Sequence, residues 1–215
     1  MHPRSILLTA VALAGFLFLT GCEHRIPPME RPEGRLAVAG FSNPRYDWQL
    51  LAGYIGVEGR SVDKVVLAEL DEAMTMILDA HQVTGYVSPK GTRQCQEIVT
   101  YDLGGGKKRP ALEYWMEVGR CMKTDYLLVP QILYWRERVG DSYTVEEPAS
   151  VVVDLYLIQI AEPHGIVRKH YDETQKALSD DLGHAAKFFD RDGKWVTAKY
   201  LAVEGLDIML LELGL

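Results

Sequence analysis

Hydrophobic and polar positions change along the chain in blocks that predict short strands and amphipathic helices. Apolar residues at helical spacing predict a helix that begins after the N-cap Ser61 and continues through Leu78. Short apolar runs at Leu36–Phe41 and Val83–Val87 end at breaks that contain serine and proline, and they predict the first two strands. The fold therefore begins with a strand, a helix and a strand.

The middle of the chain alternates between polar and amphipathic sequence. The region Lys90–Arg109 is polar and contains a glycine run, so its pattern predicts a long excursion without regular structure. Pro110 suits the first position of a second helix. The apolar side of that helix is expected to comprise Leu112, Trp115, Met116, Gly119 and Met122.

Apolar stretches in the second half predict consecutive strands at Tyr126–Arg136, Ser150–Ala161 and Ile166–Gln175. Pro130 has no amide hydrogen for a ladder, so it predicts a bulge or an unpaired position in the first of these strands. Parallel neighbours would need crossover helices between them. The strand at Ser150–Ala161 should therefore run antiparallel to both of its neighbours.

The end of the chain predicts helical closure of the fold. A short helix is expected within residues 178–189, and Thr197 is expected to cap a terminal helix. A chain of this length can bury one sizeable core but is short for two. Residues 36–215 are therefore expected to form a single mixed α/β domain.

Residues 1–21 have the pattern of a lipoprotein signal peptide. An apolar run from Ile6 to Leu19 follows Arg4 and is shorter than the roughly 20 residues that a helix needs to cross a bilayer. The run ends in the sequence Leu-Thr-Gly-Cys, a bacterial lipobox in which the small pair before Cys22 suits a signal peptidase. We expect Cys22 to become an acylated first residue. An uncleaved anchor with an incidental cysteine is the alternative.

The residues after the lipobox predict a tether and a location. Residues 22–35 combine prolines with charges and lack an apolar period, so they are expected to form an extended link between the acylated cysteine and the domain. Glu23 follows Cys22 in place of the aspartate that commonly retains lipoproteins in the inner membrane. We therefore expect an outer-membrane lipoprotein that faces the periplasm.

The charge balance excludes one class of partner. The chain has 23 Lys and Arg against 30 Asp and Glu, which gives a formal net charge of −7. Such a chain is not suited to nucleic acid, nor to a broad electrostatic contact with anionic lipid headgroups. Membrane attachment is therefore expected only through the acyl chains on Cys22.

Two cysteines remain besides Cys22, and an extracytoplasmic compartment allows them to pair. A Cys95–Cys121 disulfide would contribute roughly 3 kcal/mol to stability by loop entropy. Two free thiols packed as small hydrophobes are the alternative. The sequence leaves both open.

Three segments resemble the group that contains the TolB amino-terminal domain, CsgG and LpoB. They are the opening strand Leu36–Phe41, the stretch Gly119–Gln131 with its Thr-Asp-Tyr-Leu-Leu-Val core, and the paired strands of Val151–Tyr171. The resemblance implies a three-layer α/β/α sandwich with a five-stranded mixed sheet in the order 2-1-3-4-5, strand 4 antiparallel. It also implies an envelope protein that acts by contact, without catalysis.

Motifs for catalysis or for metal binding are incomplete in this sequence. The glycine run at 104–106 lacks the Walker spacing, and Asp190–Gly193 lacks the bidentate carboxylate of a calcium loop. The histidines are scattered and form no HExxH pattern. We therefore identify no catalytic, cofactor-binding or metal-binding residue, and expect no cofactor.

Aromatic residues offer the remaining candidates for a functional surface. Tyr134, Trp135 and Tyr143 lie beside or within the charged connection between two predicted strands, and aromatic side chains commonly anchor contact surfaces. Core packing is the alternative use.

The sequence predicts a non-catalytic adaptor, or an assembly or regulatory factor, of a cell-envelope complex. The complex would be a cell-wall synthase, a secretion pore or a transport system. An envelope hydrolase, a metal-dependent enzyme and a small-ligand sensor are the alternatives.

Overall fold

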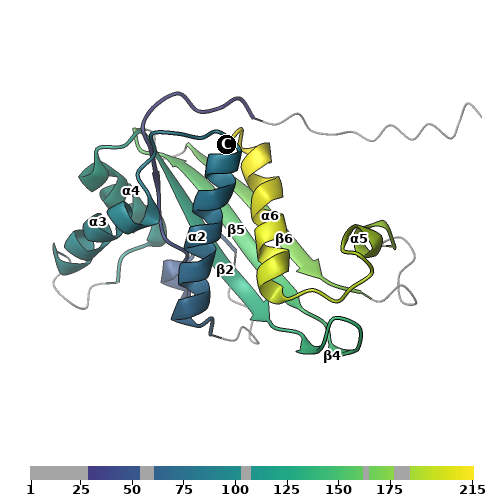
Figure 1. Ribbon diagram of the computed structural model, residues 1–215. Coiled ribbons are helices and arrows are strands. Elements are labelled where there is room, and N and C mark those ends of the chain that lie inside the picture. Colours follow the sequence, from purple (N-terminus) through teal and green to yellow (C-terminus); the bar gives the residue numbers. More distant parts are fainter. Residues whose placement is uncertain (1–28, 54–60, 103–107, 162–164, 177–184) are drawn as a thin grey trace, which may run out of the picture.

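Four strands form the main sheet in the order β1-β2-β5-β6 (Figure 1). They comprise β1 (Leu36–Val38), β2 (Tyr126–Arg136), β5 (Ser150–Gln159) and β6 (Ile166–Thr174). β1 and β2 are parallel, whereas β5 is antiparallel to both β2 and β6. The mixed α/β class and the reversed direction of β5 were predicted correctly.

The computed structural model describes residues 29–53, 61–102, 108–161, 165–176 and 185–215. The expected signal peptide and Cys22 lie outside these residues, as do residues 162–164, the glycine run at 104–106 and the segment 178–184. Within the described ranges, no helix combines the length and the apolar character needed to span a membrane.

The expected second strand is reduced to one residue. Val87 forms an isolated parallel bridge with Ala37, with Val38 N donating to Val87 O and Val87 N to Leu36 O, both at 2.9 Å. Gly85 has φ +75°, and α3 begins at Pro89, so little extended chain is left between them. The predicted five-stranded sheet therefore has four strands, with this single bridge beside β1.

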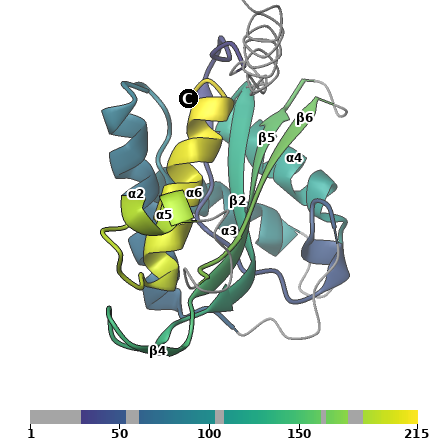
Figure 2. The ribbon, with the colours of Figure 1, turned by 90° about the vertical axis from the view of Figure 1, so that its right-hand side faces the viewer.

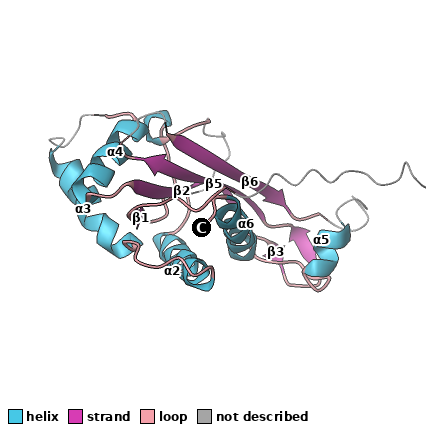
Figure 3. Cartoon of the chain, turned by 90° about the horizontal axis from the view of Figure 1, so that it is seen from above, coloured by secondary structure: helices cyan, strands magenta, loops and turns pink. Residues whose placement is uncertain are grey.

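Helices pack against both faces of the sheet (Figures 2 and 3). Helices α2 (Lys64–Ala80) and α6 (Ala198–Glu212) cover one face, where Leu128 and Leu155 point into the larger apolar cluster. Helices α3 (Pro89–Asp102) and α4 (Ala111–Met122) cover the other face, where Leu127 and Tyr156 point into the second cluster. β2 and β5 are buried from both sides, which explains their nearly continuous apolar sequence.

Two predictions about the helices were wrong. Asp63, and not Ser61, caps α2, because its side chain accepts a hydrogen bond from Val65 N at 2.8 Å. Lys90–Arg109 contains most of α3 in place of an irregular excursion. Its buried side chains include Thr92, Cys95 and Val99, a stripe too narrow and too polar to stand out in the sequence.

The irregularity expected at Pro130 lies farther along β2. Pro130 pairs in register with Leu155, and the register shifts between Ile132 and Tyr134. The Pro130 carbonyl accepts a hydrogen bond from Ser42 N at 3.3 Å, so its ring nitrogen also faces the side of β1, beyond the end of that strand. The amide hydrogen that Pro130 lacks would therefore point to a place where the β1–β2 ladder has already ended.

Short elements occupy the far end of the sheet. β3 (Val139–Gly140) and β4 (Val145–Glu147) pair within the connection from β2 to β5. Helix α5 (Ala185–Asp190) follows β6. Thr197 caps α6 as predicted, since its hydroxyl accepts from Tyr200 N at 3.2 Å.

Residues 29–35, which composition places in the tether, contact the domain. The Arg31 guanidinium donates to His81 O at 3.1 Å, to Gln82 O at 3.3 Å and to Gly214 O at 3.2 Å. These carbonyls belong to the C-terminal ends of α2 and α6. The chain thus enters the fold beside its own C-terminus.

Candidate functional site

A pocket of about 650 Å³ opens at the C-terminal end of β1, between the 3-10 helix η1 (Asp47–Gln49), α3 and α4. From β1 the chain runs to α2 on one face of the sheet, and it returns to β2 through α3 and α4 on the other face. In α/β sheets, ligands commonly bind at the carboxyl ends of the strands, at the point where successive connections change from one face of the sheet to the other. The fold therefore places this pocket where binding is expected.

Aromatic rings form much of the wall of this pocket. Phe41, Trp48, Tyr114 and Trp115 all line it. Trp48 is 37% exposed and stacks on Tyr46, with ring centroids 5.8 Å apart and planes inclined by 10°. Trp115 is almost fully buried. The lining of the pocket thus includes both a partly exposed and a buried tryptophan ring.

The charged residues in the wall are all cations. Arg93, Lys108 and Arg109 line the pocket, and none of the described lining residues is acidic. Arg93 Nη2 lies 3.6 Å from the Asp71 carboxylate, a long ion pair. Within the part of the chain that the structure describes, Lys108 and Arg109 form no side-chain hydrogen bond or ion pair. This local reversal of charge occurs in a chain with a net charge of −7.

The start of α4 adds backbone donors to the same wall. Pro110 occupies the N-cap position and makes no side-chain cap hydrogen bond. Ala111, the first residue of the helix, lines the pocket. The first amides of a helix lack partners within it and carry the positive end of its dipole. The end of α4 therefore reinforces the positive potential of Lys108 and Arg109.

Polar contacts and one covalent bond hold the walls in place. Gln131 is buried in β2, where its side chain accepts from Leu51 N at 3.3 Å and donates to Gln49 O at 2.9 Å. Cys95 on α3 and Cys121 on α4 form a disulfide with Cα atoms 5.8 Å apart, the first of the two alternatives that the sequence left open. Both helical walls of the pocket are thus fixed to each other.

Tyr114 contributes a neutral hydroxyl to this wall. Burial raises the pKa of the Tyr114 hydroxyl, although hydrogen bonding with Thr100 and Gln96 acts in the opposite direction. The phenol therefore keeps its proton throughout the neutral range and adds no negative charge to the pocket.

A second polar cluster centres on Asp154, which is fully buried on β5. Its carboxylate accepts hydrogen bonds from Tyr156 Oη at 2.7 Å and from Arg168 Nε at 3.0 Å, and contacts His170 Nδ1 at 2.6 Å. Burial, followed by the hydrogen bond to Asp154, raises the pKa of Tyr156 well above its ordinary value. These contacts join β5 to β6 and satisfy the buried carboxylate.

The three aromatic residues predicted at a contact surface differ in their surroundings. Tyr143 is 76% exposed at the tip of the β3–β4 hairpin, Tyr134 is half-buried, and Trp135 is only 8% exposed. Along β2, Leu128 and Ile132 face α2 and α6, and simple alternation would send Trp135 to the opposite face. The register shift after Ile132 turns the indole back into the larger core. The burial of Trp135 argues against a contact role for it.

The hairpin that carries Tyr143 has a defined base. The Asp141 carboxylate accepts from Tyr143 N at 2.7 Å and from Thr144 N at 2.8 Å, and these hydrogen bonds lower the pKa of Asp141. Trp195 N donates to Ser142 O at 2.9 Å. The hairpin is therefore attached to the segment between α5 and α6.

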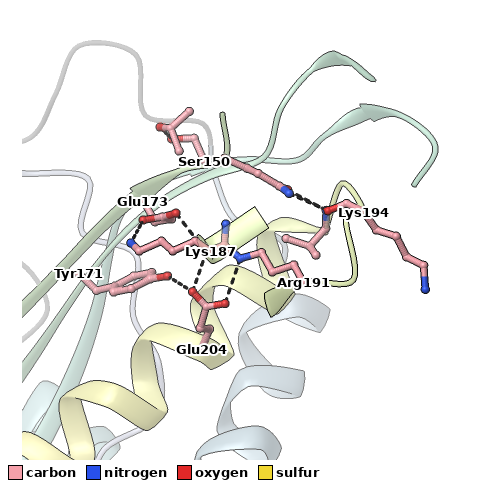
Figure 4. A network of polar contacts seen from close by, with 10 residues as sticks. Ser150, Tyr171, Glu173, Lys187, Arg191, Lys194 and Glu204 are labelled. Carbon is pink, nitrogen blue, oxygen red and sulfur yellow. Dashed lines mark hydrogen bonds and ion pairs between the residues drawn. The ribbon is translucent and has the colours of Figure 1, made fainter. Parts of the chain in front are cut away.

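A network of ion pairs fixes α5 and the following segment to the sheet (Figure 4). Arg191 lies between Glu173 of β6 and Glu204 of α6, at 3.1 Å and 2.6 Å, with its side chain only 3% exposed. Lys187 of α5 donates to Glu173 at 2.7 Å, and Tyr171 donates to Glu204 at 2.8 Å. Phe189 projects from this fixed base and is 66% exposed.

The sequence did not indicate the pocket, because its cations lie in a region predicted to lack structure. The combination of Arg93, Lys108 and Arg109 with nearby aromatic residues was the signal that could have revealed it. Of the histidines, His81 contacts Asp207 and Leu215 O, both at 2.9 Å, while His24, His164 and His184 lie outside the described residues. In the described ranges, no group of at least three His, Cys, Asp or Glu side chains is arranged to hold a metal.

Comparison with known proteins gives likeness in structure only. No family model and no curated protein matches the sequence. Similar solved structures include the PelC dodecamer from Paraburkholderia phytofirmans, 13% identical, covering 87% of this chain and 91% of that chain with a TM-score of 0.47. The LpoB C-terminal domain from Salmonella enterica is 12% identical, with 75% and 92% covered and a TM-score of 0.37.

Lipoprotein GNA1162 from Neisseria meningitidis is a further neighbour, 13% identical, with 74% of this chain and 96% of that chain covered and a TM-score of 0.36. The group of envelope lipoproteins that the sequence resembles is thus represented among the similar structures. At these identities the likeness concerns the fold.

Proposed function

We propose that the protein is a lipid-anchored, periplasm-facing, non-catalytic adaptor of a cell-envelope complex. The observation that carries this proposal is the exposed aromatic end of the domain, where Tyr143 projects from a hairpin held by Asp141 and Phe189 projects from a helix held by buried ion pairs. Exposed aromatic residues on a rigid support bind a partner without a large loss of conformational freedom. The lipobox that ends at Cys22 supports attachment through a lipid, and Glu23 after it supports the outer membrane as the location.

Crosslinking in cells tests the adaptor role. The variant Tyr143→Ala with Phe189→Ala should reduce capture of one main envelope protein, because each truncated aromatic anchor is worth roughly 1 to 3 kcal/mol. Tyr46→Ala is the matched control, since Tyr46 is 59% exposed but lies beside the pocket, away from the hairpin. Equal capture by all three proteins would reject this contact surface.

Trp135→Ala does not belong in this test. Removing a buried indole costs roughly 3 to 5 kcal/mol of stability, so lost capture would only report unfolding. Tyr143 and Phe189 avoid that difficulty because both side chains are mostly exposed.

Metabolic labelling with a fatty-acid probe tests the anchor. Cys22→Ser should abolish incorporation of the label, because acylation requires the thiol. Cell fractionation of the unmodified protein should place it in the outer membrane. Equal labelling of the variant would contradict the lipoprotein assignment, whereas turnover of an envelope substrate by the purified protein would favour the enzyme alternative.

A further inference from the structure

We propose that the pocket between η1, α3 and α4 binds a small organic anion in which a phosphate or carboxylate group is attached to a sugar or aromatic ring. This site lies beyond the adaptor role, and its existence does not depend on that role. The argument rests on the charge, the rings and the size of the pocket.

The charge of the lining selects an anion. Arg93, Lys108 and Arg109 converge on the pocket, and its described lining contains no carboxylate. The uncapped N-terminus of α4 presents backbone amides beside these cations. Side-chain cations and helix amides are independent features, and both attract negative charge to the same place.

The Asp71 carboxylate beside Arg93 does not cancel this charge, and Glu113 in the first turn of α4 does not line the pocket. Asp71 accepts a hydrogen bond from Phe41 N at 2.6 Å and lies 3.6 Å from Arg93. Its position beneath Arg93 orients the guanidinium, while 63% of the Arg93 side chain stays exposed. Lys108 and Arg109 form no ion pair with any residue in the described part of the chain.

The aromatic wall selects a ring next to the anionic group. Trp48 lines the pocket and is 37% exposed, and its stacking on Tyr46 orients the indole. Phe41 and Trp115 provide an apolar surface deeper in the pocket. Stacking on such faces favours planar or ring-shaped ligands over inorganic phosphate alone.

The size and the rigidity of the pocket limit the ligand further. A volume of about 650 Å³ lies within the usual range of small-molecule sites, roughly 300 to 1,000 Å³, and suits a mono- or disaccharide derivative. The Cys95–Cys121 disulfide and the hydrogen bonds of Gln131 hold the walls apart without a ligand. The site is therefore preformed.

Binding of four probes to the full chain tests the proposal. The probes are glucose 1-phosphate, glucuronate, glucose and inorganic phosphate, measured by isothermal titration and by the fluorescence of the tryptophans. Glucose 1-phosphate or glucuronate should bind at least about tenfold more tightly than glucose and than inorganic phosphate. The comparison of these two anions distinguishes a phosphate ligand from a carboxylate ligand.

Matched variants locate the binding in this pocket. Lys108→Gln with Arg109→Gln should weaken anion binding at least about tenfold, and Trp48→Ala should weaken it about fivefold. Lys64→Gln is the control, because Lys64 is an exposed cation at the start of α2, on the opposite face of the sheet. Its affinity should match that of the unchanged protein.

Three results would overturn the proposal. The first is the absence of binding by both ring-bearing anions at millimolar concentration. The second is binding of glucose as tight as that of the two anions, which would show that the charge is not required, or equally tight binding of inorganic phosphate, which would show that the ring is not required. The third is unchanged affinity in the Lys108 and Arg109 double variant, which would place the anion elsewhere.

Discussion

The arginines at the two ends of the domain have opposite surroundings. Arg191 is 3% exposed between Glu173 and Glu204, both within 3.1 Å. Arg109 lines the aromatic pocket, which has no described acidic residue, and a smaller hollow that Glu113 and Glu117 also line, but no described group pairs with it. Arg191 therefore stabilises the fold, whereas Arg109 is available to contact a ligand in the pocket.

This difference shows that the partners of a charge, and not its residue type, decide what it does. A buried arginine with two carboxylates has no capacity left for a ligand. A cation that lines a pocket and has no ion-pair partner can attract an anionic ligand. The buried network of Arg191 thus serves stability, whereas the cations of the pocket are free to contact a ligand, and substitutions should separate the two properties.

The largest effect is expected where the network is buried. Arg191→Met should lower the free energy of unfolding by roughly 3 to 5 kcal/mol, because it leaves Glu173 and Glu204 with Lys187, which is half-exposed, as their remaining cation. Arg120→Met is the control, since Arg120 pairs with Glu117 at 2.6 Å on the exposed surface of α4 and should cost at most about 1 kcal/mol. Urea denaturation measures both. Equal losses would contradict the assignment of Arg191 to a structural role.

The disulfide is expected to give the next largest effect, at the pocket end. Reduction of Cys95–Cys121 should lower the free energy of unfolding by about 3 kcal/mol, because the reduced unfolded chain gains conformational freedom. Urea denaturation with and without reductant measures the difference, and intact mass should rise by about two hydrogens on reduction. Thiols that alkylate freely without reductant would contradict the disulfide.

Glu204, at the α5 end, should contribute to the pH dependence of stability. Burial opposes ionisation of Glu204, but the hydrogen bonds from Arg191 and Tyr171 and the nearby charges of Arg191 and Lys187 outweigh it and lower its pKa. A pKa lowered by folding gives stability that is present above the unfolded pKa of about 4.3 and is lost as the pH falls through the folded pKa. The free energy of unfolding should therefore decline below about pH 4.5.

Glu204→Gln isolates this contribution. The variant should lose roughly 1 kcal/mol at neutral pH and should show a shallower decline in acid, because it has no carboxylate to protonate. Denaturation at pH 7 and pH 3.5 gives both quantities. An acid slope equal to that of the unchanged protein would assign the dependence to other carboxylates.

Elements with a regular pattern of burial could be predicted from the sequence, whereas features set by tertiary contacts could not. The apolar runs of β2, β5 and α6 were predictable because core packing imposes a regular pattern of burial. Helix α3 escaped prediction because a disulfide and a narrow stripe hold it in place. The burial of Trp135 could not be predicted, because a register shift, invisible in the sequence, changes the face to which it points.

The candidate site was harder to predict than the fold. Arg93 and Arg109 are separated along the chain, and only the packing of α3 beside α4 brings them to one pocket. The charge partners of Arg191 are likewise set by tertiary structure. Composition gave the correct overall charge but could not show that its sign reverses locally.

The smallest expected effect on stability completes the comparison. Lys108→Gln with Arg109→Gln should change the free energy of unfolding by no more than about 0.5 kcal/mol, because these side chains have no described partner whose charge would be left uncompensated. Removing positive charge beside the N-terminus of α4 also relieves an unfavourable interaction with the helix dipole, so a slight gain is the expected direction. Thermal denaturation in low salt measures this change. A loss comparable to that of Arg191→Met would mean that the pocket cations support the fold, and the distinction between the two ends would fail.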